Sequence, residues 1–234
     1  MVEFLYTGDP FDEMPNQYEM NPEKIGKLVW LSGAPGLGKS TSGMLLAKKA
    51  GYVYFEADAF GNHMNPYVST EVDEPTLAMI SQKFLKGVPQ SRIDGVSESV
   101  HELTSFSKGL DYDFKGLVNF YTLLCENIIS EQKRIGGNFA IAQAVATREV
   151  RDHIRNLLGP KLIFVVLTMT REDQENRIKA RHGDAPRVVE KLVKMYDLYE
   201  PAGEGEPNTI NCVITKDMTR DDVTDKIISL VKES

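Results

Sequence analysis

Residues 28–43 read LVWLSGAPGLGKSTSG, and this stretch carries the most specific signal in the chain. A run of apolar residues leads into three glycines within six positions, followed by a lysine and a hydroxyl side chain. Glycine loses more conformational entropy on folding than other residues, so such a cluster between a strand and a helix indicates that the backbone approaches another group closely. Residues 33–40 match G-x-x-x-x-G-K-[ST], the pattern of the phosphate-binding loop.

The spacing predicts a role for each part of this loop. Its backbone amides would point at phosphate oxygens, Lys39 would reach the β- and γ-phosphates, and Ser40 would hold Mg²⁺. A glycine-rich turn without a ligand needs neither a lysine nor a hydroxyl at these two positions. The predicted nucleotide-binding residues of this segment are Gly33, Ala34, Pro35, Gly36, Leu37, Gly38, Lys39, Ser40 and Thr41.

Composition restricts the class of protein. The chain has 234 residues, 41% of them hydrophobic, which is enough for one α/β domain. A net charge of −7 argues against nucleic acid as the main partner, because phosphate backbones attract basic surfaces. We find no apolar run long enough to cross a membrane and no secretory leader. Cys125 and Cys212 lie in apolar surroundings, which is typical of reduced, buried thiols. Together with the lack of a membrane-spanning run, this predicts a cytoplasmic protein without membrane partners.

Apolar strand-like runs alternate with helical stretches from residue 27 onward. The strand-like runs cover residues 27–32, 52–57, 139–145, 162–169 and 209–214. The helical stretches cover residues 39–50, 114–134, 148–158, 171–181, 186–199 and 220–232. Nearly continuous apolar strands that alternate with helices predict a five-stranded parallel sheet covered on both faces, a three-layer α/β fold.

Three segments depart from this alternation. Residues 1–26 contain six acidic residues, one lysine and scattered aromatic residues, which predicts an acidic N-terminal arm. Residues 27–234 then form a single domain. Within it, 61–113 contains helix-like pieces and no convincing strand, so we interpret it as a helical insertion. Residues 171–187 form a polar helix and a glycine break, which we interpret as a short lid.

Ligands of open parallel sheets gather at the carboxyl ends of the strands. The second strand is followed by Asp58, which could orient a hydroxyl group, accept its proton or hold water on Mg²⁺. A turn or helix-cap role is the alternative for Asp58, and the role of Glu56 two residues earlier is left open. The third strand ends at Gln143, which could bond the nucleophile, a Mg²⁺-bound water or the substrate.

Two sets of arginines follow these strands. Arg148, Arg151 and Arg155 share one helix face and would repel one another unless an anion or nearby acids relieve the repulsion. We predict that Arg148, nearest the strand end, contacts substrate or phosphate, and leave Arg151 and Arg155 open. Arg177 and Arg181 lie one turn apart and suit stacking on a base and neutralising phosphates, although a solvated charged helix is the alternative.

Several stretches together resemble the gluconokinase and shikimate-kinase group of small-molecule P-loop kinases, and gluconokinase most closely. They are LSGAPGLGKSTSGMLLA, YFEADAFGNHMNP, AIAQAVATREVRDHIR, TREDQENRIKARHGD continuing to MYDLYEP, and INCVITKDMTRDDVTDKIISLV. The resemblance implies a P-loop kinase fold and Mg-ATP as the phosphoryl donor. It also implies Lys39 and Ser40 on phosphates and Mg²⁺, Asp58 on the acceptor hydroxyl, Arg177 against adenine and Arg181 as the lid arginine.

The acceptor half departs from the family pattern. The family's lysine in the third-strand segment is Thr147 here, and residues 68–113 are largely unmatched. We therefore expect a kinase that phosphorylates a hydroxyl of a small polar metabolite, with 61–113 as its acceptor-binding insertion. The alternatives are a nucleoside or nucleotide kinase, and a non-catalytic nucleotide-binding module that acts through a protein partner. A homodimer is left open.

Overall fold

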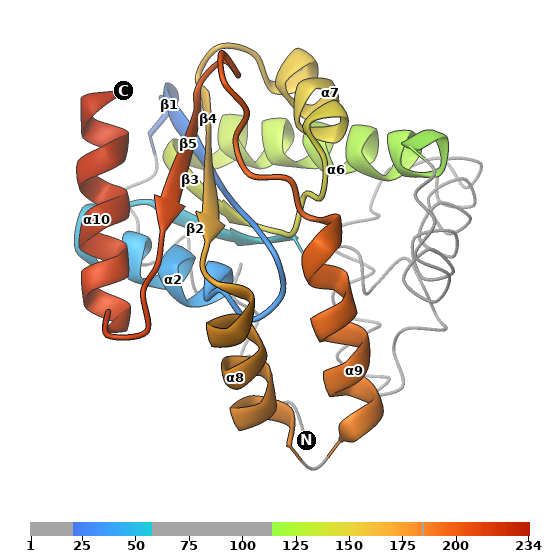
Figure 1. Ribbon diagram of the computed structural model, residues 1–234. Helices are drawn as coiled ribbons and strands as arrows, with labels where there is room; N and C mark the ends of the chain where they lie inside the picture. The colour runs from blue at the N-terminus through green and yellow to red at the C-terminus, as the bar shows by residue number, and fades with distance from the viewer. Residues whose placement is uncertain (1–20, 58–113, 184) are drawn as a thin grey trace, which may run out of the picture.

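A five-stranded parallel sheet forms the centre of the computed structural model, which describes residues 21–57, 114–183 and 185–234 (Figure 1). The strands are β1 (Asn21–Ser32), β2 (Val53–Glu56), β3 (Gly136–Ala142), β4 (Leu162–Thr168) and β5 (Thr209–Val213). The helices are α2 (Lys39–Ala50), α6 (Phe114–Ile135), α7 (Arg148–Leu158), α8 (Arg171–His182), α9 (Pro186–Lys194), the 3₁₀ turn η1 (Met195–Leu198) and α10 (Arg220–Glu233).

Strand β1, which carries the phosphate loop, lies in the middle of the sheet. The strand order is β2-β3-β1-β4-β5, and Leu28 of β1 pairs with Phe139 of β3 on one side and Leu162 of β4 on the other. All pairs are parallel. The carboxyl ends of the strands therefore meet at one edge, where α2 begins and α8 and α9 extend away from the sheet (Figure 1).

Each face of the sheet has its own core. Trp30 and Phe164 point to the face covered by α6 and α7, and their rings lie 5.7 Å apart. Val29 precedes Trp30 on β1, and Val165 follows Phe164 on β4. Both valines point to the face covered by α2 and α10. Successive strand residues alternate between faces, so a strand that is apolar at every position is buried on both. The predicted three-layer α/β fold is confirmed.

All predicted strands and helices of the described segments are present, with shifts at their ends. Strand β1 begins at Asn21, inside the stretch we interpreted as an arm. Strand β3 ends at Ala142, earlier than expected. The Val145 amide donates to the Ser32 hydroxyl and that hydroxyl donates to the Val145 carbonyl oxygen, each at 3.0 Å. Val145 therefore bonds a side chain in place of a neighbouring strand. The helix expected over 186–199 ends at Lys194 and continues as η1.

Side-chain caps fix the starts of three helices. Thr147 accepts from the backbone amide of Val150 at the start of α7, and Thr170 caps α8 in the same way. Thr219 and Asp222 form a reciprocal capping box on α10. Such a cap contributes about 1 kcal/mol to the free energy of unfolding. The capping role of Thr147 also gives a local reason for a hydroxyl side chain at this position.

The two cysteines agree with expectation. Cys125 and Cys212 are both buried and free, and burial raises the pKa of each thiol. No helix among the described residues combines the length and apolar character that crossing a membrane requires.

Candidate functional site

The phosphate loop lies at the carboxyl end of β1 and leads directly into α2. Gly33, Gly36 and Gly38 have φ angles of 125°, 82° and 86°, a region that residues with side chains rarely adopt. A Cβ at Gly33 would also fall against the backbone oxygen of Leu167 in β4. The three glycines therefore give the loop a path that few other residues allow.

Lys39, the first residue of α2, folds back over this loop. Its Nζ donates to the backbone oxygens of Gly33, at 2.9 Å, and Ala34, at 3.0 Å. The N-terminus of α2 has no side-chain cap and no acidic residue in its first turn, which also contains Ser40 and Thr41. A helix start without a side-chain cap and the positive end of the helix dipole suit an anionic ligand, so this part of the structure fits a phosphate chain.

Strand β3 places Gln143 beside the end of β1. The backbone N–H of Gln143 donates to the Leu31 backbone oxygen at 3.2 Å, and the backbone oxygen of Gln143 accepts from the indole nitrogen of Trp30 at 3.3 Å. The side chain is buried, and its Oε1 has no hydrogen-bond partner among the described residues. A buried acceptor without a partner is costly, so this oxygen is suited to receive a donor from a ligand.

The carboxylates expected at the site are placed only in part. Asp58 and the predicted insertion at 61–113 lie outside the described residues. Glu56 is the last residue of β2 and pairs with Ala142 in the sheet register, and its side chain is likewise outside the description. Among the residues that are described, no group of three or more His, Cys, Asp or Glu side chains could hold a metal ion. That Ser40 and Asp58 hold Mg²⁺ stays a prediction.

Helix α8 packs directly on the phosphate loop. Gln174 is fully buried, and its Nε2 donates to the backbone oxygen of Pro35 at 3.0 Å. Ile178, one turn later, is 1% exposed, and its Cγ1 lies 3.1 Å from the position that a Cβ on Gly36 would occupy. Sequence reasoning missed Gln174 because it interpreted the helix as mostly solvated. Its spacing of four residues from Ile178 is the signal that could have revealed it.

Solved structures with this architecture include several small-molecule kinases. A gluconokinase from Sinorhizobium meliloti 1021 aligns with a TM-score of 0.57 at 16% identity, over 90% of this chain and 94% of that chain. A sugar kinase from Janibacter sp. HTCC2649 aligns with a TM-score of 0.58 at 17% identity, over 88% and 95% of the two chains. An APS kinase from Mycobacterium tuberculosis, solved with AMPPNP and APS, aligns with a TM-score of 0.50 at 16% identity, over 89% and 99%.

The chain has the P-loop kinase fold. The resemblance noted in the sequence is thereby confirmed at the level of architecture. No protein-family model matches the sequence, and no curated protein matches it. Because one fold can host many activities, the function of this P-loop kinase fold has to be argued from the side chains of the site.

The arginines of α7 contact acidic residues of the described structure. Arg148 is exposed; its backbone amide donates to Oε2 of Glu200 at 2.7 Å, and its Nε lies 3.6 Å from the Asp152 carboxylate. Arg151 is fully buried, and its Nε and Nη2 donate to the two carboxylate oxygens of Glu206 at 2.6 and 2.9 Å. Arg155 contacts Glu206 as well, at 2.8 Å, and pairs with Asp152.

Glu206 is thus the acid that relieves the repulsion between Arg151 and Arg155. Burial alone would raise the pKa of Glu206, but hydrogen bonds from Arg151, Arg155 and the Gly203 amide outweigh it and lower the pKa to about 2. Arg151 also donates to the backbone oxygens of Glu200 and Pro201. The two arginines therefore fasten the chain segment before β5 to α7.

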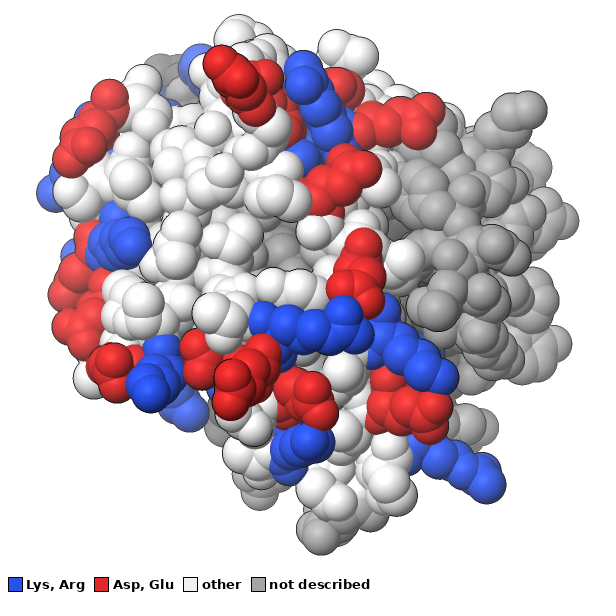
Figure 2. Space-filling model, in the orientation of Figure 1, with Lys and Arg blue, Asp and Glu red and all other residues white. Residues whose placement is uncertain are grey.

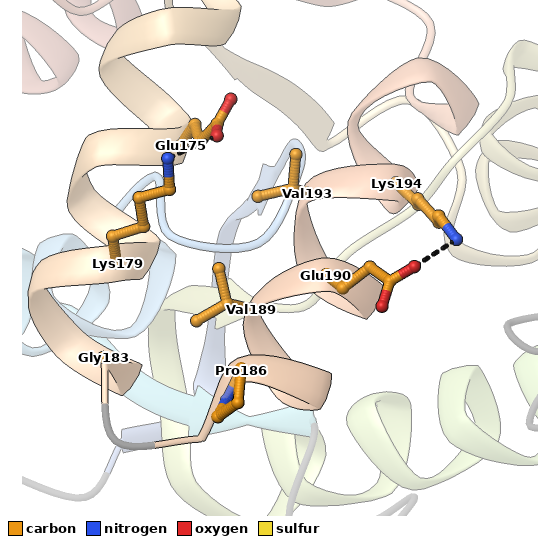
Figure 3. Close-up of a pocket in the computed structure, with 8 residues that line it drawn as sticks. All are labelled: Glu175, Lys179, Gly183, Pro186, Val189, Glu190, Val193 and Lys194. Carbon is orange, nitrogen blue, oxygen red and sulfur yellow. Dashed lines mark hydrogen bonds and ion pairs between the residues drawn. The ribbon is translucent and has the colours of Figure 1, made fainter.

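Two hollows open near these elements. One, of about 450 Å³, lies between α8 and α9, where Val189 and Val193 point toward α8 and the Glu190–Lys194 pair forms part of the rim (Figure 3). The other, of about 610 Å³, is lined by Thr147, Arg148, Glu149, Asp152 and Glu200. Neither hollow is lined by a phosphate-loop residue.

Charges of both signs alternate over α8 and α9 on the face shown in Figure 2. Lys179 pairs with Glu175, and Arg171 pairs with Asp197 at 2.6 Å. Arg177 and Arg181 have no ion pair with any residue that the structure describes. They lie three residues beyond Gln174 and Ile178, so both border the face of α8 that contacts the phosphate loop.

Proposed function

We propose that the chain is a kinase that transfers the γ-phosphoryl group of Mg-ATP to a hydroxyl of a small polar metabolite. The observation that carries the proposal is the phosphate loop, with three glycines at positive φ and with Lys39 held over its backbone oxygens. The gluconokinase and sugar kinase with the same architecture support a small-molecule acceptor. The low identity leaves its chemical class to experiment.

The nucleotide half of the site is assigned to the loop and α2. Backbone amides of 33–38 and of the first turn of α2 would bind the phosphate oxygens. Lys39 would leave the backbone oxygens of Gly33 and Ala34 and neutralise charge on the β- and γ-phosphates. Ser40 would ligate Mg²⁺, which bridges β- and γ-oxygens and neutralises developing charge. Thr41 would support the same turn.

The acceptor half is assigned to Asp58, Gln143 and Arg148. Asp58 would orient the attacking hydroxyl and accept its proton, as a carboxylate does in phosphoryl transfer. The unpartnered Oε1 of Gln143 supports a second contact, in which a hydroxyl of the acceptor donates to it. Arg148 would contact the acceptor from the start of α7.

Arg177 and Arg181 are assigned to the nucleotide from the side of α8. Both lack an ion pair in the described structure and both border the phosphate-loop face of the helix. Arg177 would stack on the base, and Arg181 would approach the γ-phosphate as the lid closes. A positioned cation at that group stabilises the charge that spreads over it during transfer.

An ATP-consumption assay against sugar acids, polyols and nucleosides, each with Mg²⁺, tests the proposal. A hydroxyl-bearing metabolite should stimulate ATP turnover, and Asp58→Asn should lower kcat by about 100-fold with a modest change in ATP affinity. Stimulation by nucleosides or nucleotides alone would favour the nucleoside-kinase alternative. No turnover with any acceptor, together with tight ATP binding, would favour a non-catalytic module.

We further propose that the enzyme works in the cytoplasm, since Cys125 and Cys212 are both buried, unpaired thiols. Whether it is a homodimer is tested by light scattering on the full chain.

A further inference from the structure

Gln174 is the polar side chain that the fold alone explains least. It is fully buried, its Nε2 donates to the backbone oxygen of Pro35, and its Oε1 has no hydrogen-bond partner in the part of the chain that the structure describes. The net gain from one neutral hydrogen bond is smaller than the cost of leaving a buried acceptor unpaired. Stability therefore gives no reason for an amide at this position, because an apolar side chain of equal size would pack there without that cost.

The place of the hydrogen bond suggests what the amide does. Pro35 and Gly36 form the turn of the phosphate loop, and Gly36 has a φ of 82°. Gln174 holds one side of that turn through the Pro35 oxygen, and Ile178 packs against Gly36 one helical turn later. The first two turns of α8 are thus attached to the loop at two successive points.

The two arginines on α8 depend on this attachment for their position. Arg177 follows Gln174 by three residues, and Arg181 follows Ile178 by three, so each arginine borders one of the two attachment points. A helix is stiff over two turns, so a shift of the loop at Pro35 is passed to both guanidinium groups. Residues 179–187 lie beyond the second attachment.

We propose that Gln174 is a positioning residue that couples the conformation of the phosphate loop to the orientation of α8. Binding of phosphate fixes the loop, the loop fixes α8 through the Gln174 amide, and Arg177 and Arg181 are thereby aimed at the nucleotide. The catalytic consequence rests on the proposed function, whereas the mechanical coupling is a property of the ligand-free chain.

Hydrogen exchange on the full ligand-free protein tests the coupling itself. Gln174→Met keeps the volume and removes the amide, and Glu175→Gln is the matched control, since Glu175 lies one residue along and pairs with Lys179. We expect about fivefold faster exchange in residues 33–39 and 171–178 of Gln174→Met, the effect of losing one hydrogen bond. In Gln174→Met, exchange in β4 and α10 and the Tm should stay at wild-type values. In the control Glu175→Gln, exchange in every segment and the Tm should stay at wild-type values.

Unchanged exchange in 33–39 would overturn the proposal. A lower Tm with faster exchange everywhere would also overturn it, because Gln174 would then be an ordinary core residue.

A second measurement adds Mg-ADP. In the wild type, protection should rise in the loop and in 177–183 together; in Gln174→Met it should rise in the loop alone. Joint protection of both segments in the variant would refute the coupling. If the wild type shows no protection at any Mg-ADP concentration, the proposed kinase function fails, and the ligand-free comparison still decides the role of Gln174.

Discussion

Replacing Glu206 with glutamine removes the carboxylate that lies between Arg151 and Arg155. The Glu206 and Arg151 side chains are both 0% exposed, and breaking a buried pair by removing one partner costs about 3–5 kcal/mol. The pKa of Glu206 gives a second measure: lowering it from 4.5 to about 2 corresponds to about 3 kcal/mol in favour of the folded, ionised state. We expect Glu206→Gln to lower the free energy of unfolding by about 3–4 kcal/mol at pH 7.

The pH dependence makes this prediction specific. A carboxyl group whose pKa is lowered by folding stabilises the protein above the pKa of the unfolded chain and loses that effect as pH falls through the folded value. For Glu206 the loss runs from pH 4.5 down to about 2. The difference in stability between wild type and Glu206→Gln should therefore shrink across that range, because the wild-type carboxylate becomes protonated.

Urea unfolding at a series of pH values, followed by the fluorescence of Trp30, measures this difference. Trp30 is the single tryptophan of the chain and is fully buried. Asp152→Asn is the control: its side chain is 47% exposed, so its loss should cost less than about 1 kcal/mol. A loss below about 1 kcal/mol for Glu206→Gln, or a difference that stays constant from pH 7 to pH 3, would refute the reasoning.

Three further predictions concern the phosphate loop and α8. Lys39→Ala should abolish phosphoryl transfer in a protein that still folds, since the Lys39 ammonium lies over the loop and donates to the backbone oxygens of Gly33 and Ala34; near-normal turnover or an unfolded variant would contradict it. Gly38→Ala should lower the free energy of unfolding by about 1 kcal/mol, because its φ of 86° disfavours a side chain. Gly36→Ala should lower it clearly more, because Ile178 also crowds that position. Equal losses in urea unfolding would show that the Ile178 contact is unimportant. Arg181→Ala should lower kcat far more than it raises KM for ATP, and an effect on KM alone would make Arg181 a ground-state binder.

The fold was predictable from the sequence because its signals are local. Apolar runs such as 162–169 mark strands buried on both faces, and the glycines of 33–38 mark the turn into α2. The assignment of the phosphate loop needed only spacing and context. These features are set by residues within a few positions of one another, so a single sequence reveals them.

The contacts of the arginines were not predictable in the same way. Arg151 bonds Glu206 across 55 positions of sequence, and no periodicity connects two residues so far apart. The sequence left the role of Arg151 open, and the fold uses this side chain to fasten the segment before β5. Gln174 was missed for a related reason: it is buried against Pro35, which lies 139 positions away in the sequence.

The position of β2 has a consequence for how such a protein changes its acceptor during evolution. Because β2 is an edge strand, the chain that continues from Glu56 starts at the border of the sheet and not at its centre. The entropy of closing such a connection grows only with the logarithm of its length, about 0.6 kcal/mol per doubling. Segments of very different length and sequence can therefore be exchanged there while the pairs of β1 with β3 and β4, which hold the phosphate loop, stay intact. Under the proposed function, a chimaera that receives the corresponding segment of a kinase with this fold should keep its nucleotide binding and acquire a new acceptor.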